Sequence, residues 1–166
     1  MGTDGSGMTR YVMKSKFGMG RDFAVTEPDD QQLFYVDGKV GATPKAEIQD
    51  AGGQVVYKVH GSFLGVPKKM SIEDTAGNEL ASMKAKMFSP IKSKVKMQLA
   101  DGSEWHIEGS LIEKNYSIEC NGATVVEISQ KWVTVRDAYS LEVADGIEPA
   151  FAVAVVWAID RWVERD

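Results

Sequence analysis

The C-terminal segment EPAFAVAVVWAIDRWVERD, residues 148–166, restricts what this chain can fold into more than any other stretch. From Pro149 to Ile159 it has no charged side chain, and the only hydrogen-bonding side chain is the indole of Trp157. Charged residues then follow in quick succession: Asp160, Arg161, Glu164, Arg165 and Asp166. A segment that is apolar on every side can span a membrane, lie on a surface as an amphipathic helix, or be enclosed by the rest of the protein.

The rest of the chain is organised as hairpins. Turn signals that combine Asp or Asn with Gly recur at VDG (36–38), DAGG (50–53), DTAGN (74–78), ADG (100–102) and CNG (120–122). Asp and Asn bond to their own main chain, and Gly adopts a positive φ at little cost. The flanking segments alternate roughly between apolar and polar residues, which is typical of strands with one buried face. A meander of many such strands tends to close into a barrel; a propeller is the other all-β solution, but its four-strand repeat is not clear here.

The C-terminal segment is therefore predicted to be a helix inside the sheet. A bilayer-spanning helix needs about 20 apolar residues, and extending this segment to that length would bring Asp160 and Arg161 into the span. A surface helix should have a polar stripe, and none exists between Ala150 and Ile159. Pro149 suits the first turn of a helix, where its missing N–H is harmless.

Length and composition fit one globular domain. The chain has 166 residues, of which 43% are hydrophobic and 26% charged, and this composition argues against disorder of the whole chain. Residues 1–7, MGTDGSG, are interpreted as a leader left from cloning, and residues 8–166 as the domain. The net charge of −5 argues against a nucleic-acid partner, although a local basic patch could still exist. Cys120 is the single cysteine, so no intramolecular disulfide can form, and the chain fits a reducing compartment.

Five stretches carry a resemblance to a known family. They are RYVMKSKFGMGRDFAV, LFYVDGKV, VYKVHGSFLGVPKKMSIED, MKAKMFSPIKSKVKM and ISQKWVTVRDAYSLEVADG, and together with the apolar helix they extend from Met8 to Asp166. In this order and spacing they resemble the LURP-one-related family of the tubby C-terminal-like superfold, in particular its small bacterial members. The resemblance implies a mainly β fold, a closed antiparallel barrel of about twelve strands that encloses a hydrophobic C-terminal helix. The core positions expected on that helix are Phe151, Val153, Val155, Val156, Trp157 and Ile159.

The resemblance implies little about activity, because most members of the family have no established biochemical function. The superfold also contains tubby proteins, which bind phosphoinositides, and phospholipid scramblases, so a lipid-related role is suggested by analogy of fold. This chain departs from scramblases, since it lacks a proline-rich N-terminal region, a cysteine cluster and a clear calcium-binding loop. Asp145 and Glu148 are weak calcium candidates, and they equally suit a turn and a helix start.

The strongest charge feature is a lysine-rich stretch with no acidic residue. On strands, alternate residues share a face, so several of these side chains would project together. Such a face could attract anionic lipid headgroups; it could also bind phosphate backbone, or it is a solvated outer face whose lysines guard against edge pairing. The candidate residues are Lys84, Lys86, Lys92, Lys94 and Lys96, with Lys68 and Lys69 as an extension.

No catalytic constellation is present in the sequence. Cys120 with His60 or His106 is the one conceivable nucleophilic pairing, and a lone cysteine is more often a small packed residue. His106 should point away from the face that buries Trp105 and Ile107, and the corner at RDAY should use Asp137 to bond turn backbone. The usual nucleotide, metal and hydrolase signatures are absent, so no cofactor is expected.

The sequence thus predicts a non-enzymatic binding or scaffold domain. The expected partner is anionic lipid or another protein, with no nucleic acid and no transmembrane span. A scramblase-like role and a cryptic enzymatic activity remain the alternatives. The expected location is the cytoplasm, with peripheral association at a membrane.

Overall fold

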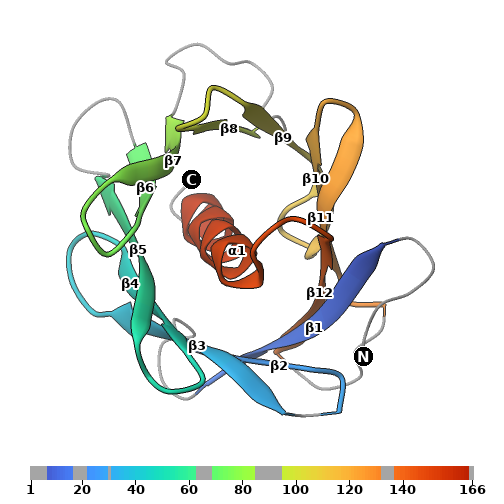
Figure 1. The fold of residues 1–166 in the computed structure, drawn as a ribbon, viewed down its shortest axis with the longest axis horizontal. Coiled ribbons are helices and arrows are strands. Elements are labelled where there is room, and N and C mark those ends of the chain that lie inside the picture. Colours follow the sequence, from blue (N-terminus) through green and yellow to red (C-terminus); the bar gives the residue numbers. More distant parts are fainter. Residues whose placement is uncertain are drawn as a thin grey trace.

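The structure, a computed structural model, describes residues 7–16, 22–29, 31–62, 69–84, 95–131 and 137–164. It contains one helix, α1 (Pro149–Glu164), at the centre of a ring of strands (Figure 1). The strands are β1 (Met8–Ser15), β2 (Phe23–Thr26), β3 (Gln32–Lys39), β4 (Lys45–Asp50), β5 (Val55–Ser62), β6 (Lys69–Glu73), β7 (Glu79–Lys84), β8 (Val95–Leu99), β9 (Glu104–Ser110), β10 (Asn115–Cys120), β11 (Ala123–Ser129) and β12 (Ala138–Ala144).

The twelve strands form a closed antiparallel barrel in which each strand pairs with its neighbours in sequence. β1 and β12 close the ring, with Met8 opposite Ala144 and Lys14 opposite Ala138 (Figure 1). The predicted fold class, a mainly β barrel around a hydrophobic C-terminal helix, is confirmed. Closure removes the unpaired edges that an open sheet would expose.

The barrel interior is filled by α1. Val153, Val155, Val156 and Trp157 are fully buried, and Ile159 is nearly so. Phe151, near the start of the helix, is partly buried and makes edge-to-face contacts with Tyr57 and Trp105, at ring-centroid distances of 5.7 and 5.6 Å. These helix side chains pack against the inward-facing residues of the strands in one continuous core. The apolar segment needs no polar stripe because protein surrounds the helix on all sides.

Asp–Gly turns form as the sequence predicts at four of the five positions. In the 74–78 turn, the Asp74 carboxylate accepts hydrogen bonds from the N–H groups of Ala76 (3.0 Å) and Asn78 (2.9 Å). A further bond from the Asn78 side chain is the leading reason why the pKa of Asp74 lies below its ordinary value. Gly77 supplies the positive φ, +89°, that the turn requires.

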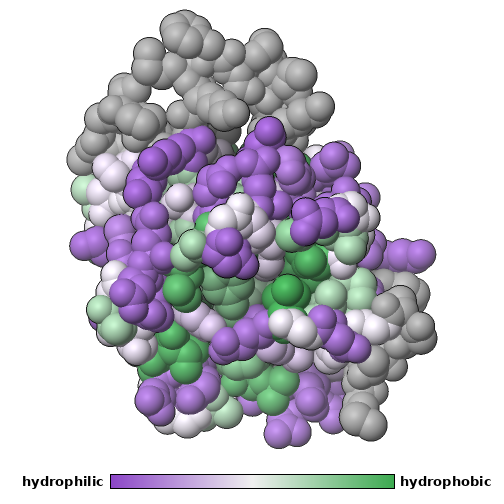
Figure 2. Space-filling view, turned by 45° about the horizontal axis from the view of Figure 1, so that its top comes forward, coloured by the Kyte–Doolittle hydropathy of each residue, from purple (hydrophilic) through white to green (hydrophobic). Residues whose placement is uncertain are grey.

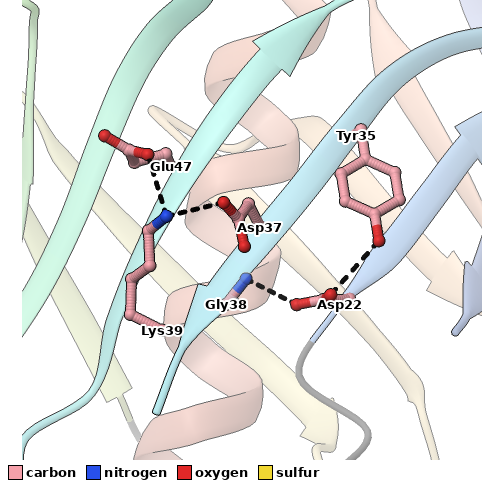
Figure 3. Close-up of polar contacts among 6 residues, drawn as sticks. All are labelled: Asp22, Tyr35, Asp37, Gly38, Lys39 and Glu47. Carbon is pink, nitrogen blue, oxygen red and sulfur yellow. Dashed lines mark hydrogen bonds and ion pairs between the residues drawn. The ribbon is translucent and has the colours of Figure 1, made fainter. Parts of the chain in front are cut away.

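The fifth predicted turn, VDG at 36–38, is wrong: these residues lie inside β3. Figure 3 shows why the backbone stays extended here. The Asp22 carboxylate accepts a hydrogen bond from the Gly38 N–H (2.7 Å) and another from the Tyr35 hydroxyl (3.2 Å). Asp37 instead contacts Lys39 on the same strand, at 2.6 Å, so its side chain does not cap a turn.

The alternation of strand directions gives the barrel two distinct ends. At the start end, where α1 begins, the connections are 27–31, 51–54, 74–78, 100–103, 121–122 and 145–148. At the exit end, where α1 finishes, the connections are 16–22, 40–44, 63–68, 85–94, 111–114 and 130–137.

Candidate functional site

Three of the seven lysines predicted to form a binding face are described by the structure, and all three lie at the exit end. Lys69 is the first residue of β6, Lys84 is the last residue of β7, and Lys96 is the second residue of β8. Lys68, Lys86, Lys92 and Lys94 lie outside the described residues.

Strand register aligns these side chains in a row on the outer surface, which we call the cation row (Lys69, Lys84 and Lys96). Lys69 is directly opposite Lys84, and Lys96 is directly opposite His106. The pairing of Ser82 with Gln98 puts Lys84 in line with Lys96. Their strand neighbours Met70, Met83 and Met97 are buried, so the row faces outward. Like charges directly opposite each other in a sheet are destabilising, so the row has an electrostatic cost.

Carboxylates beside the row offset part of its charge. Lys69 pairs with Glu79 at 2.9 Å, and Lys96 lies 3.7 Å from Glu104. The bond from Lys69 is the leading reason why the pKa of Glu79 is lowered. Lys84 is exposed and has no carboxylate within ion-pair distance among the described residues, and its charge also helps to lower the pKa of Glu79. Since Lys69 and Lys96 have closer carboxylate partners, Lys84 is the lysine of the row most open to an external anion.

The outer surface shows no broad apolar face in the view of Figure 2, where hydrophilic and hydrophobic residues are interspersed. Among the described residues, two large hydrophobic side chains are strongly exposed: Val40, 78% exposed, and Ile112, 81% exposed. Both lie in connections of the exit end.

A buried polar cluster lies where α1 finishes. Asp160 is 2% exposed, and its carboxylate accepts a hydrogen bond from Lys114 Nζ (2.8 Å) and another from the Tyr139 hydroxyl (2.7 Å). Burial, followed by the Asp160 charge, raises the pKa of Tyr139 well above its ordinary value. The guanidinium of Arg161 lies 5.5 Å from the ring centroid of Trp157. From the sequence, Asp160 and Arg161 argue only against a membrane span, and their place in a buried cluster is not predicted.

Next to this cluster is a pocket of about 280 Å³. It is lined by Asp160 and Arg161 of α1 and by Ile112 and Lys114 of the β9–β10 connection. Lys114 and Tyr139 are already engaged with Asp160. The cluster therefore joins the helix to β12 and to the β9–β10 connection, and we interpret it as a structural anchor for α1.

The weak calcium candidates Asp145 and Glu148 each have a hydrogen-bond partner elsewhere in the barrel. Glu148 accepts a hydrogen bond from the Tyr57 hydroxyl, and the backbone N–H of Asp145 donates to the Gly7 carbonyl (2.9 Å). Within the part of the chain that the structure describes, no three His, Cys, Asp or Glu side chains come together as a metal site.

The conceivable nucleophilic pairing is also not assembled. Cys120 is partly buried, whereas His60 contacts Glu73 at 2.5 Å and His106 contacts Glu104 at 3.1 Å. His106 does point away from buried Trp105 and Ile107, as predicted. The corner at Asp137 has a left-handed φ of +61°, and its backbone carbonyl, not its side chain, accepts a hydrogen bond from the Ser15 N–H (3.0 Å).

Comparisons with known proteins agree with this architecture. A family model described as LURP-one-related matches residues 8–160. The uncharacterized protein YxjI of Bacillus subtilis is 22% identical over 139 residues, which cover 72% of this chain and 85% of YxjI. An X-ray structure of an Arabidopsis thaliana protein superimposes with a TM-score of 0.67 at 18% identity, covering 93% of this chain and 91% of that one. Among the described residues, no helix is both long enough and apolar enough to cross a membrane.

Proposed function

The chain belongs to the LURP-one-related family, and from that premise and the cation row we propose that it is a non-enzymatic binding domain for anionic phospholipid headgroups. The observation that carries this proposal is the placement of Lys84 directly opposite Lys69. This pairing by itself does not stabilise the sheet, because like charges that are directly opposite each other on neighbouring strands repel. A phosphate group between the two lysines would turn that repulsion into attraction.

The state of the neighbouring groups supports the same interpretation. Lys69 and Lys96 already have carboxylate partners, whereas Lys84 is exposed between them. Each lysine close to an anionic membrane surface contributes about 1 kcal/mol to binding. The row would therefore supply weak, reversible and salt-sensitive attachment.

Vesicle flotation tests this function. The parent protein should float with vesicles of equal parts phosphatidylcholine and phosphatidylserine, and it should stay in solution with phosphatidylcholine alone. Lys84→Glu should weaken binding about fivefold or more, because one attraction is lost and one repulsion is added. Lys58→Glu is the charge-matched control, since Lys58 is also exposed and the charge change is the same, but it lies in the middle of β5. Because Lys58 is directly opposite Glu47 and Glu73, far-ultraviolet circular dichroism first checks that this variant is folded. Equal losses in both variants, or no flotation of the parent, would contradict the proposal.

The same variant separates function from stability. Lys84→Glu replaces a like-charge pair directly opposite Lys69 with an opposite-charge pair, and it also replaces the weaker attraction to Glu79 with repulsion. Because the directly opposite pair is the closer one, the free energy of unfolding should rise by about 0.2–1 kcal/mol while vesicle binding weakens. Urea denaturation measures this change. A destabilised Lys84→Glu variant would mean that Lys84 has a structural partner, and its binding loss would no longer argue for a lipid site.

A further inference from the structure

The charges of this acidic protein are segregated between the two ends of the barrel. A charged residue is assigned to an end of the barrel when it lies in a connection at that end or within two residues of such a connection in the adjoining strands. Charged residues in the terminal turn of α1 are assigned to the end at which that turn lies. Every described lysine except Lys58 belongs to the exit end: Lys14, Lys16, Lys39, Lys45, Lys69, Lys84, Lys96, Lys114 and Lys131. Among the described residues of the start end there is no lysine or arginine.

The start end is acidic. Its described acidic residues are Glu27, Asp29, Asp50, Glu73, Asp74, Glu79, Asp101, Glu104, Glu119, Asp145 and Glu148. At the exit end, the described acidic residues are Asp22, Glu113, Asp137, Glu164 and the buried Asp160. Carboxylates from farther along the strands also contact lysines of this end: Asp37 and Glu47 contact Lys39, Glu79 contacts Lys69, and Glu104 contacts Lys96. The exit end keeps an excess of positive charge, so the net charge of −5 hides a charge asymmetry along the barrel axis.

Exposed apolar side chains are found at the same end. Val40 lies in the connection between β3 and β4, and Ile112 lies in the connection between β9 and β10. These two hairpins are six strand positions apart in a ring of twelve, so the side chains occupy opposite sides of one rim. Two apolar contacts on opposite sides of a rim can touch one flat surface at the same time.

From these features we propose that the protein docks with its exit end flat on an anionic bilayer, with Val40 and Ile112 in the lipid interface and the surrounding lysines at headgroup level. This orientation rests on the lipid-binding function proposed above. The acidic start end is then repelled from the membrane, so the charge asymmetry selects one of the two barrel ends. Paired exposed apolar residues distinguish a bilayer from nucleic acid, because a phosphate backbone needs only the cations.

Depth-dependent fluorescence tests the orientation. Because Cys120 is the single cysteine, a Cys120→Ser background allows one label at a time. Labels are placed at Ile112→Cys and Val40→Cys on the exit end, and at Ala76→Cys and Ala51→Cys in start-end turns. With vesicles of equal parts phosphatidylcholine and phosphatidylserine, an environment-sensitive fluorophore at 112 or 40 should shift to the blue and be quenched by a quencher attached to the lipid chains. The labels at 76 and 51 should show neither change.

The outcomes separate the orientation from the function. If the protein floats with vesicles but the start-end labels respond, or only one exit-end label responds, the flat docking is wrong while lipid binding stands. If no variant and no parent protein binds vesicles, both proposals are wrong. Binding of duplex DNA or RNA without vesicle binding would assign the basic end to nucleic acid and overturn the bilayer.

An unlabelled variant supplies an independent check. Val40→Ser/Ile112→Ser changes two exposed side chains, so the circular dichroism spectrum and the urea midpoint should stay near those of the parent. Its vesicle affinity should fall several-fold, and the remaining binding should be abolished by high salt, because only the charged contacts are left. An unchanged affinity would overturn the insertion of these two residues.

Discussion

Among the described glycines, Gly109 has the least room for a side chain. Its φ is +117°, and a Cβ there would lie 2.7 Å from the Asn115 carbonyl oxygen and 2.8 Å from the Tyr116 Cα. Gly109→Ala should lower the free energy of unfolding by about 1–3 kcal/mol from backbone strain, and by about 1–3 kcal/mol more from overpacking. Urea denaturation measures the loss. Gly77→Ala is the matched control, because Gly77 has a positive φ but no atom within 4 Å of an added Cβ. Equal losses in the two variants would show that the close approach of β10 is unimportant.

Tyr139 ties the stability of the core to alkaline pH. Its hydroxyl donates to Asp160, and burial is the first cause that raises its pKa above the ordinary value of 10.0. The folded state therefore keeps the proton where the unfolded state loses it. Stability is fully present below pH 10 and should fall as the pH rises beyond it, by about 1.4 kcal/mol per pH unit for each such tyrosine. Burial raises the pKa of Tyr116 in the same direction.

Urea denaturation from about pH 8 to about pH 11 checks this dependence. Tyr139→Phe should lose about 1.5–3 kcal/mol at neutral pH, because a hydrogen bond to a charged group is removed. Its alkaline decline should be shallower than that of the parent. Parallel declines in both proteins would show that Tyr139 titrates as an exposed phenol.

At the scale of elements, α1 is predicted to be indispensable for folding. Val156 is fully buried at the barrel centre, and Val156→Asp places a charge there with no described partner, which should prevent soluble folding. Val155→Asp should behave in the same way. Val40→Asp makes the same chemical change at a side chain that is 78% exposed, so it should leave folding intact. Soluble yield and far-ultraviolet circular dichroism compare the three variants. A soluble, folded Val156→Asp protein would mean that the helix can leave the barrel.

Most elements could be predicted from the sequence because their signals are local. Period-two alternation and Asp–Gly turns identified the hairpins, and the missing polar stripe identified the central helix. The VDG at 36–38 failed because Asp22, which is distant in sequence, holds the Gly38 N–H in strand geometry. A turn signal describes what the local chain permits, and a partner from another strand can override it.

The candidate site was harder to predict because it depends on register. Bulges shift the pairing between Ile72 and Glu73 and between Ile48 and Gln49, and a shift of one residue moves every later side chain to the other face. The alignment of Lys69 with Lys84 therefore could not be read from spacing alone. The Asp160 cluster joins residues 21 and 46 positions apart, and it forms only when the barrel closes around α1.

At the scale of the molecule, the charge asymmetry was accessible from the sequence but was hidden by summation. The net charge of −5 by itself argues against a nucleic-acid partner. In an antiparallel meander, alternate connections lie at opposite ends, so charges counted over alternate connections would have separated a basic end from an acidic one. The net charge determines binding only when a partner interacts with the whole molecule, whereas a flat partner surface interacts with one end of the barrel at a time.

Ion-exchange chromatography tests this separation without any lipid. At an ionic strength of about 0.01 M the screening length is about 30 Å, so a negatively charged resin interacts with both ends and repels the net charge. At about 0.1 M the screening length is about 10 Å, and the resin interacts only with the end that faces it. The protein has a pI of about 5.1, yet at neutral pH it should be retained on a cation exchanger most strongly at the intermediate ionic strength. Lys84→Glu should reduce this retention more than Lys58→Glu, because only Lys84 belongs to the exit end. Absence of retention at every ionic strength would show that the lysines of the exit end do not act as one surface.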